Sequence, residues 1–97
     1  SLESFCKKKI KKPMPYQSAV CPGKHRLLLE GSAYNKTGKP IYLEYEMPTY
    51  NTRGERKGLF TGRQMLEPKE WNEYSGDYQD CIENFDAGRL KFQAYAP

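Results

Sequence analysis

The stretch Pro40-Ile41-Tyr42-Leu43-Glu44-Tyr45-Glu46-Met47 alternates strictly in the character of its side chains. Side chains on a β-strand point in turn to its two faces, so residues two positions apart share a face. One face would carry Ile41, Leu43, Tyr45 and Met47, and the other would carry Tyr42, Glu44 and Glu46. This stretch therefore predicts a β-strand with one buried face and one face open to solvent.

Apolar residues recur with a period of two along most of the chain, which is typical of strands rather than helices. The predicted strands are Phe5–Ile10, Arg26–Tyr34, Pro40–Met47, Leu59–Met65, Cys81–Phe85 and Arg89–Tyr95. Strands that each bury one face predict two packed antiparallel sheets. The expected fold class is all-β: a six-stranded antiparallel β-sandwich with a disulfide and at most one short helix, forming a single small β domain over residues 1–97.

The connections predict two hairpins, one long loop and one short helix. Asn35–Lys39 is short, polar and contains glycine, and Asp86–Gly88 also ends in glycine, so each is predicted to close a hairpin. Pro48–Gly58 is rich in polar residues and predicts a long exposed loop. Glu67–Tyr74 is the helix candidate, because Pro68 suits a first helical position.

Composition bounds the function only loosely. The chain of 97 residues carries a formal net charge of +4, which permits weak attraction to anionic partners without establishing nucleic-acid binding. A run of about 18 apolar residues is absent, so no segment is expected to cross a membrane. No signal peptide is visible, as expected for the mature form of a secreted protein. The tripeptide Asn35-Lys36-Thr37 fits the N-glycosylation pattern, which also occurs by chance.

The residue pattern offers no catalytic or cofactor-binding motif. His25 is the single histidine and lacks a supporting serine or aspartate arrangement, so we expect a surface or strand-edge histidine. The cysteines and histidine do not have the spacing of a compact zinc site, and no glycine cluster has phosphate-loop spacing. Trp71, Tyr74 and Tyr78 are expected to form a small satellite core rather than a ligand cage. We therefore expect no enzyme activity, no metal and no cofactor.

Three cysteines leave one thiol that is free or pairs between chains. Cys6 and Cys81 lie near opposite ends of the chain, each in a predicted strand, so a bond between them would tie the first strand to the last hairpin. Either of them could instead pair with Cys21, although a Cys6–Cys21 bond would close a proline-rich loop. Because disulfides persist in oxidising compartments, we expect a secreted protein.

Two groups of charged side chains are candidate contact surfaces. The run Lys7-Lys8-Lys9-Ile10-Lys11-Lys12 could contact phosphate, but we favour a solvated edge strand that its lysines protect against pairing with another sheet. Arg53, Arg56 and Lys57 lie close to Tyr50 in the predicted loop. Arginine beside tyrosine at a loop tip is suited to binding, and it is also ordinary loop composition.

The order of the elements matches a known pattern. With Phe5-Cys6 in the first strand and Asp80-Cys81 at the start of the fifth, the chain resembles the small secreted fungal effectors of the MAX type. The resemblance implies a six-stranded sandwich with a Cys6–Cys81 disulfide, which leaves Cys21 free. It also implies a non-enzymatic virulence protein that binds a host protein, often through exposed strand edges.

A second resemblance covers roughly residues 26 to 72. Asn35–Leu43, Arg56-Lys57, Thr61-Gly62 and Pro68–Trp71 are similar to the arm-site DNA-binding domain of certain tyrosine recombinases. That domain lays a three-stranded sheet on DNA, so this resemblance implies nucleic acid as the alternative partner. Tight duplex binding that weakens steeply with salt would favour it.

We expect a partner to bind along one contiguous strip. The outward side chains of Pro40–Met47 continue into the following loop, and unpaired strand edges would add backbone hydrogen bonds. The candidate binding residues are Tyr42, Glu44, Glu46, Tyr50, Arg53 and Arg56. A host protein is the expected partner, with nucleic acid as second choice and no membrane partner.

Overall fold

The computed structural model describes residues 2–97, and β-strands make up most of this part of the chain. The helical elements are α1 (Leu2–Phe5) and the 3-10 turn η1 (Ala87–Arg89). The strands are β1 (Cys6–Ile10), β2 (Met14–Tyr16), β3 (His25–Asn35), β4 (Ile41–Tyr50), β5 (Arg56–Leu66), β6 (Trp71–Ile82), β7 (Asn84–Phe85) and β8 (Lys91–Tyr95). The all-β prediction is confirmed, although the sequence pattern missed β2 and most of β6.

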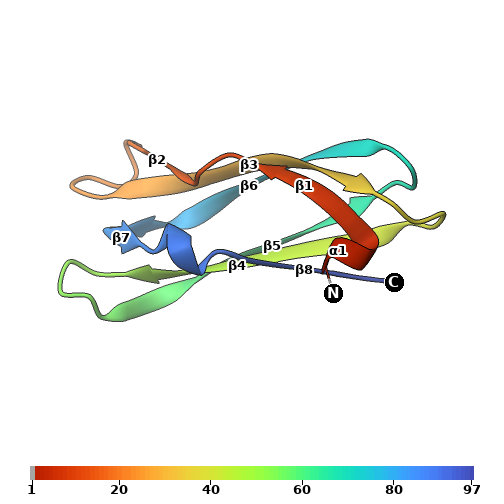
Figure 1. The fold of residues 1–97 in the computed structure, drawn as a ribbon. Helices are drawn as coiled ribbons and strands as arrows, with labels where there is room; N and C mark the ends of the chain where they lie inside the picture. Colours follow the sequence, from red (N-terminus) through yellow and green to blue (C-terminus); the bar gives the residue numbers. More distant parts are fainter. Residues whose placement is uncertain (1) are drawn as a thin grey trace.

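The strands form two antiparallel sheets that pack face to face (Figure 1). In sheet A, β3 is central, with β6 on one side and β1 and β2 one after the other on the other side. In sheet B, β4 is central in the same way, between β5 and the successive strands β7 and β8. The predicted sandwich of two antiparallel sheets is thus confirmed.

The connections differ from those predicted, because neither expected hairpin forms. Residues 36–40 cross from β3 in sheet A to β4 in sheet B. Each of these strands has one apolar face, and packing the two faces together buries both. Near the C-terminus, β7 and β8 both pair with β4, at Thr49–Tyr50 and Tyr42–Glu46, so they lie in line and form no hairpin. The predicted loop Pro48–Gly58 is also shorter than expected, since β4 and β5 both extend into it.

The predicted helix at Glu67–Tyr74 is wrong, because this segment is a tight turn that leads into β6. Lys69 has a positive φ of 57° in this turn. The Asn72 side chain accepts from the Glu67 amide at 2.9 Å and donates to the Glu67 carbonyl at 3.1 Å. Beyond the turn, Trp71–Ile82 alternates with the period of a strand, so the proline signal marked a turn instead of a helix start.

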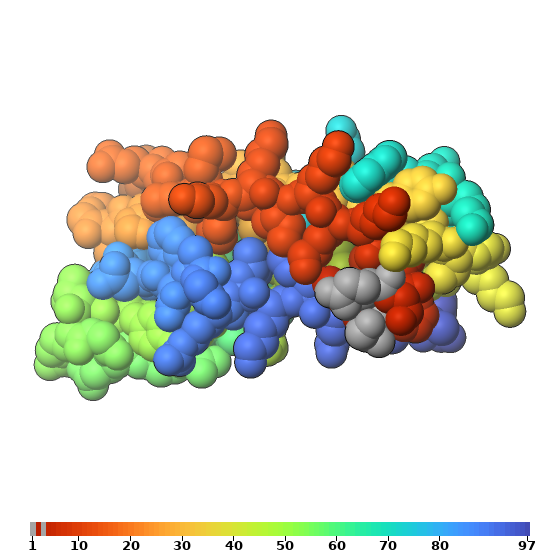
Figure 2. Space-filling view, in the orientation of Figure 1, coloured from red at the N-terminus to blue at the C-terminus, as the bar shows by residue number. Residues whose placement is uncertain are grey.

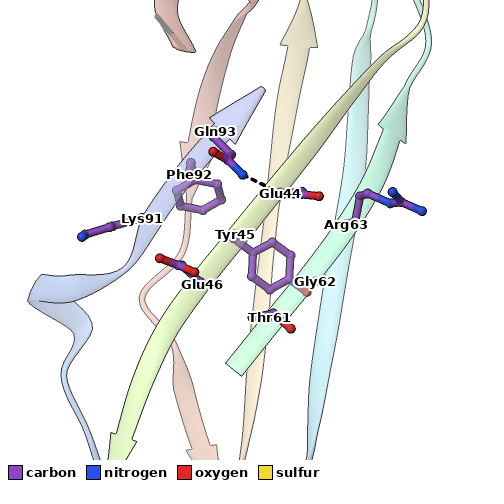
Figure 3. A pocket seen from close by; sticks show the side chains of 9 residues that line it. All are labelled: Glu44, Tyr45, Glu46, Thr61, Gly62, Arg63, Lys91, Phe92 and Gln93. Carbon is purple, nitrogen blue, oxygen red and sulfur yellow. Dashed lines mark hydrogen bonds between the residues drawn. The ribbon is translucent and has the colours of Figure 1, made fainter. Parts of the chain in front are cut away.

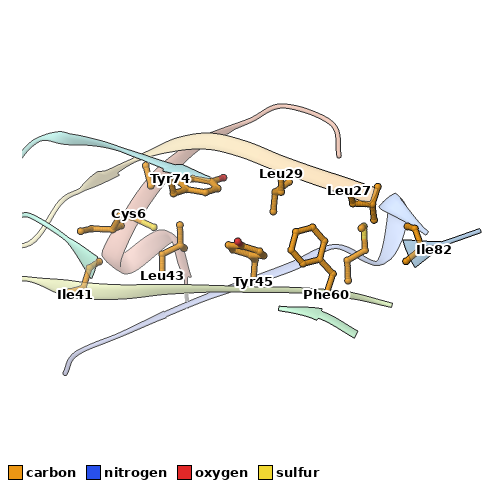
Figure 4. Packing of buried hydrophobic residues seen from close by; sticks show 12 residues of the cluster. Cys6, Leu27, Leu29, Ile41, Leu43, Tyr45, Phe60, Tyr74 and Ile82 are labelled. Carbon is orange, nitrogen blue, oxygen red and sulfur yellow. The ribbon is translucent and has the colours of Figure 1, made fainter. Parts of the chain in front are cut away.

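The core lies between the two sheets and is built from the inward faces of the strands (Figure 4). Its buried members are Leu27, Leu29 and Ala33 of β3; Ile41, Leu43, Tyr45 and Met47 of β4; Phe60 and Leu66 of β5; Tyr74 and Ile82 of β6; and Cys6 of β1. The Tyr45 ring contacts those of Phe60 and Tyr74, at centroid distances of 5.8 and 6.2 Å. Gly62 and Gly76 lie against its phenol and leave no room there for a β-carbon. The inward face predicted for β4 is thus confirmed.

The aromatic side chains of β6 separate and do not form the predicted satellite core. Tyr74 belongs to the main core, and Tyr78 stacks on Phe60 with 5.0 Å between ring centroids. Trp71 lies on the opposite side of the sheet and is 47% exposed. Strand alternation is the reason, because Tyr74 and Tyr78 are an even number of residues apart and Trp71 is an odd number away from both.

The Cys6–Cys81 disulfide does not form, because Cys81 is bonded to Cys21, with 5.4 Å between the two α-carbons. Cys6 pairs in register with Asn35, at one end of β3. Cys81 lies at the other end, close to where β6 pairs with His25. The two ends are ten residues of β3 apart, or about 33 Å, whereas bridged cysteines need α-carbons within about 7 Å. The first strand is where the sequence predicted it, but Cys6 is buried in the core away from the disulfide.

Asn35 is a structural residue and not an accessible glycosylation acceptor. Its side chain is fully buried, and its Nδ2 donates to the Lys39 carbonyl at 2.7 Å and to the Leu66 carbonyl at 3.0 Å. Its Oδ1 accepts from the Thr37 amide at 2.9 Å. The nitrogen that would carry a glycan is therefore occupied in the folded protein. These bonds also join the end of β3 in sheet A to the end of β5 in sheet B.

One side of the sandwich is closed by the two ends of the chain. Figure 2 shows the N-terminal segment, in red and orange, beside the C-terminal segment, in blue. α1 contacts β8, and the Lys8 ammonium lies 5.0 Å from the ring centroid of Phe92. Among the described strands β1 pairs with β3 alone, and four of its five residues are exposed. The lysine-rich run is therefore an edge strand, as the sequence predicted.

Candidate functional site

The outward side of sheet B is the surface on which the predicted binding residues gather. It is named face B here and consists of Tyr42, Glu44 and Glu46 of β4; Leu59, Thr61, Arg63 and Met65 of β5; and Lys91, Gln93 and Tyr95 of β8. The register aligns them in rows across the sheet, such as Gln93–Glu44–Arg63 and Lys91–Glu46–Thr61. Because both edges of β4 are paired over these residues, the free strand edge expected at Pro40–Met47 is not available, and a partner would meet side chains.

Glu44 is held at the centre of face B by two donors from β8. The Tyr95 hydroxyl donates to its Oε1 at 2.5 Å, and the Gln93 Nε2 donates to its Oε2 at 2.7 Å. These hydrogen bonds, with that from Tyr95 foremost, favour the ionised carboxylate and lower the pKa of Glu44. Glu44 is therefore charged at neutral pH, and both its oxygens are occupied within the sheet.

Arg63 crosses the same face from β5 and completes the arrangement. Its Nη1 donates to the Tyr95 hydroxyl at 3.3 Å, and its guanidinium lies 4.5 Å from the ring centroid of Tyr42. The Tyr42 and Tyr95 rings are 5.6 Å apart between centroids. Side chains from three strands thus hold one another in place. Tyr42, Glu44, Arg63 and Tyr95 are together named the face B cluster.

A shallow depression of about 560 Å³ lies beside this cluster (Figure 3). Its floor is the row Phe92–Tyr45–Gly62, and the two neighbouring rows of face B form its walls. Glu46 and Lys91 are neighbours within one of these rows, and no ion pair joins them in the structure of residues 2–97. Both charges are therefore available to a partner, and the open shape suits contact with a surface more than enclosure of a small molecule.

Half of the predicted binding strip lies on face B. Tyr42, Glu44 and Glu46 point outward from β4 as predicted, and Glu46 is the most exposed of them. Tyr50 comes at the end of the same strand, after a register shift in the pairing of β4 with β5. Its hydroxyl accepts from the Arg89 Nη1 at 3.2 Å. The structure thus keeps Tyr50 in line with β4 but ties it to η1 instead of to the loop arginines.

The two predicted arginines lie beyond the end of face B. Arg53 is in the turn between β4 and β5, and Arg56 is the first residue of β5. The Arg53 Nε forms an ion pair with the Glu55 Oε1 at 2.8 Å, and both side chains are more than half exposed. The Arg56 Nε donates to the Gly58 carbonyl at 3.3 Å. These local bonds hold the arginines close to their own turn, where exposed pairs contribute little to stability.

Among the side chains that meet at Glu44, the sequence analysis missed Arg63, Gln93 and Tyr95. A period of two does place Arg63 on one face of its strand, and it does the same for Gln93 and Tyr95. That pattern carries no information on which strands become neighbours. The meeting of these side chains at Glu44 depends on the register between strands far apart in the sequence.

His25 and the potential metal ligands are the remaining candidates from the sequence. His25 begins β3, its ring lies 6.4 Å from that of Phe85, and its Nε2 is buried without a hydrogen-bond partner among the described residues. Within residues 2–97, no group of three or more histidine, cysteine, aspartate or glutamate side chains could hold a metal ion. No helix in this described range has the length and apolar character needed to cross a bilayer.

Comparison of the chain with protein-family models, with curated proteins and with solved structures finds no match. The segment from residue 26 to 72 that is similar to a recombinase arm-site domain is divided between the two sheets, with β3 in sheet A and β4 and β5 in sheet B. The side chains on the outward sides of sheets A and B are therefore the basis for inferring function.

Proposed function

We propose that this chain is a small secreted protein, not an enzyme, that binds a partner protein through face B. The face B cluster carries the proposal, because its side chains are already held in position at the middle of an open sheet face. Side chains that are ordered before binding lose less entropy when a partner docks. The Cys21–Cys81 disulfide supports an oxidising compartment, where such bonds persist.

The residue types on face B support a protein as the partner. Tyrosine, methionine and arginine are enriched in protein interfaces, whereas lysine, glutamate and serine are depleted there. Tyr42, Arg63 and Tyr95 form the centre, and Leu59 and Met65 are 38% and 39% exposed on the same face. An apolar or aromatic patch on a partner would be buried against this centre, where truncation of a tyrosine or arginine has its largest effect.

The charges around the centre define what the partner should present. Glu46 and Lys91 lie at the depression with opposite signs, so a matching basic and acidic group on the partner would fix its orientation. A host protein is the class of partner that the resemblance to MAX-type effectors implies.

Site-specific photo-crosslinking in host extract tests this proposal. A photo-reactive residue at Thr61 of face B is compared with one at Ser32, on the outer side of sheet A. We expect one crosslinked host protein from position 61 and none from position 32. The product should disappear with Arg63→Ala and persist with Arg53→Ala, which alters only the turn. Equal products from both positions, or a product that Arg63→Ala leaves unchanged, would contradict the proposal.

Salt dependence separates this function from DNA binding. Docking of a protein on an aromatic centre should weaken only modestly between about 0.05 M and 0.5 M salt, whereas duplex binding falls steeply through counterion release. Tight duplex binding with such a steep fall would favour the recombinase-type alternative.

A further inference from the structure

The outward side of sheet A differs in kind from face B. It is named face A and consists of Lys7 and Lys9 of β1 with Lys11 just after it, together called the edge segment; Glu30, Ser32 and Tyr34 of β3; and Trp71, Glu73 and Ser75 of β6. The register aligns them in the rows Lys7–Tyr34–Trp71 and Lys9–Ser32–Glu73, followed by Lys11 with Glu30 and Ser75. Lysine, glutamate and serine predominate, and these are residue types that protein interfaces avoid.

A shallow depression of about 630 Å³ lies between the second and third rows. Its charged lining residues are Lys9, Lys11, Glu30 and Glu73, so its formal charge is zero. Lys11 and Glu30 form an exposed ion pair at 3.4 Å, which water screens strongly. In the described part of the chain no hydrogen bond engages the side chains of Ser32, Glu73 or Ser75. The depression therefore offers hydrogen-bond donors and acceptors side by side, and those of Ser32, Glu73 and Ser75 are open to a ligand.

Two aromatic side chains, Tyr34 and Trp71, adjoin this depression and are together named the aromatic step. Trp71 is 47% exposed, and the Tyr34 ring lies 5.7 Å from it between centroids. The Lys9 Nζ is 4.9 Å from the Trp71 ring centroid and Lys9 also lines the depression, so the two features share a wall. Trp71 takes no part in the core, and its indole offers a flat apolar surface with a polar edge.

We infer that face A binds a neutral polysaccharide chain, a function separate from the docking of a protein on face B. A pyranose ring has an apolar C–H side and a rim of hydroxyl groups, each of which can donate and accept a hydrogen bond. Its recognition needs a flat apolar surface beside alternating donors and acceptors. The aromatic step and the depression supply these side by side, and the zero formal charge of the depression disfavours a polyanion.

The dimensions of face A also fit a chain-like ligand. Tyr34 and Glu30 are four residues apart on β3, or about 13 Å along the strand, which spans a short oligosaccharide. The depression is open and shallow, so the polymer can continue beyond the residues that grip it. Isolated sugars would therefore bind more weakly than oligomers, because they could not contact the aromatic step and the depression together.

Tryptophan fluorescence gives a direct test, because Trp71 is the single tryptophan of the chain. The intact protein is titrated with cellohexaose, laminarihexaose and chitohexaose. We expect a saturable change in emission with at least one of them. The affinity should be nearly independent of salt, since a neutral ligand releases no counterions.

Calorimetry on variants with the same oligosaccharide identifies the face. Trp71→Ala should weaken binding at least about tenfold, which corresponds to about 1.4 kcal/mol. Glu73→Gln should weaken it by a smaller factor, because an amide keeps one acceptor oxygen. Tyr42→Ala, on face B, is the matched control and should bind the sugar normally. Circular dichroism of Trp71→Ala, expected to match that of the wild type, checks that the variant is folded.

Three results would overturn the inference. The first is no saturable signal with any of the oligosaccharides, and the second is wild-type affinity in Trp71→Ala. The third is binding of dextran sulfate or single-stranded DNA alone, lost at high salt, which would mean that the lysines of the edge segment act as a polyanion site without the aromatic step.

Discussion

Face A and face B are built by the same rule and present opposite kinds of surface. Each has a central strand between two partners and a shallow depression between rows of side chains. On face B, Glu44 and Arg63 are engaged by tyrosines of neighbouring strands, so these two charges already have partners within the protein. On face A, Glu73 and the serines are left to solvent. We infer from this comparison that what each face can bind depends on whether its polar groups satisfy one another.

Tyr45→Ala should have the largest effect, because both faces depend on the core beneath them. The ring packs between the sheets against Gly62 and Gly76, and its removal leaves a cavity that should cost about 4 kcal/mol of unfolding free energy. Urea denaturation measures this loss. Tyr42→Ala, on the outward side of the same strand, should cost about 1 kcal/mol or less. Similar losses for the two variants would mean that the inward face of β4 is misassigned.

The disulfide should stabilise the sheet that carries face A. The double variant Cys21→Ser with Cys81→Ser removes a crosslink over 60 residues and should lower the unfolding free energy by about 3 kcal/mol. Hydrogen exchange should rise first at the His25 end of β3, and later on face B. Peptide mapping without reduction should recover Cys21 linked to Cys81, and a Cys6–Cys81 peptide would refute this pairing.

Asn35→Ala should break the joint between the two sheets. The carbonyl of the buried Leu66 would lose its side-chain donor, and that of Lys39 would keep only the Thr37 hydroxyl, which should cost about 2 kcal/mol. Thermal unfolding measures the effect, and Asn84→Ala, at an exposed position, is the control. Expression in a glycosylating host should yield folded protein without a glycan at Asn35. Folded, glycosylated protein of normal stability would contradict the buried position of this side chain.

Arg63→Ala should separate the faces by function. Affinity for a purified protein partner should fall by about 1–3 kcal/mol, because the arginine orders Tyr42 and Tyr95 as well as making contacts. Sugar binding on face A should not change. Arg53→Ala, in the exposed turn, is the control and should leave both activities intact. If Arg53→Ala has the larger effect on the protein partner, the turn and not face B is the interface.

The smallest expected effect is a pH dependence at face B. The pKa of Glu44 lies below its ordinary value of 4.5 because Tyr95 and Gln93 donate to the ionised form. A lowered pKa in the folded state stabilises the protein above the unfolded pKa, and this contribution is lost as the pH falls through the folded pKa. Carboxyl titration by NMR should give a midpoint below 4.5, which Tyr95→Phe moves upward. A wild-type midpoint at or above 4.5 would show that these hydrogen bonds are absent in solution.

The accuracy of the sequence analysis differs between features of a strand and features of a connection. The alternation in β4 correctly placed Leu43 and Tyr45 inward and Glu44 outward, and the lysines of β1 correctly indicated an edge. The link Asn35–Lys39 was misread, because a short polar link between two strands is equally compatible with a hairpin and with a crossing between sheets. Burying two apolar faces against each other stabilises the crossing more than any local turn preference.

Local alternation was therefore sufficient to establish an all-β sandwich and to separate core side chains from surface side chains. Packing decided everything that involves two distant strands: the partner of Cys81, the meeting of Glu44 with Arg63 and Tyr95, and the position of Trp71 beside Tyr34. The physical reason is the range of each interaction. The direction of a side chain is set by the backbone of its own strand, whereas register and sheet membership are set by the burial of the whole chain.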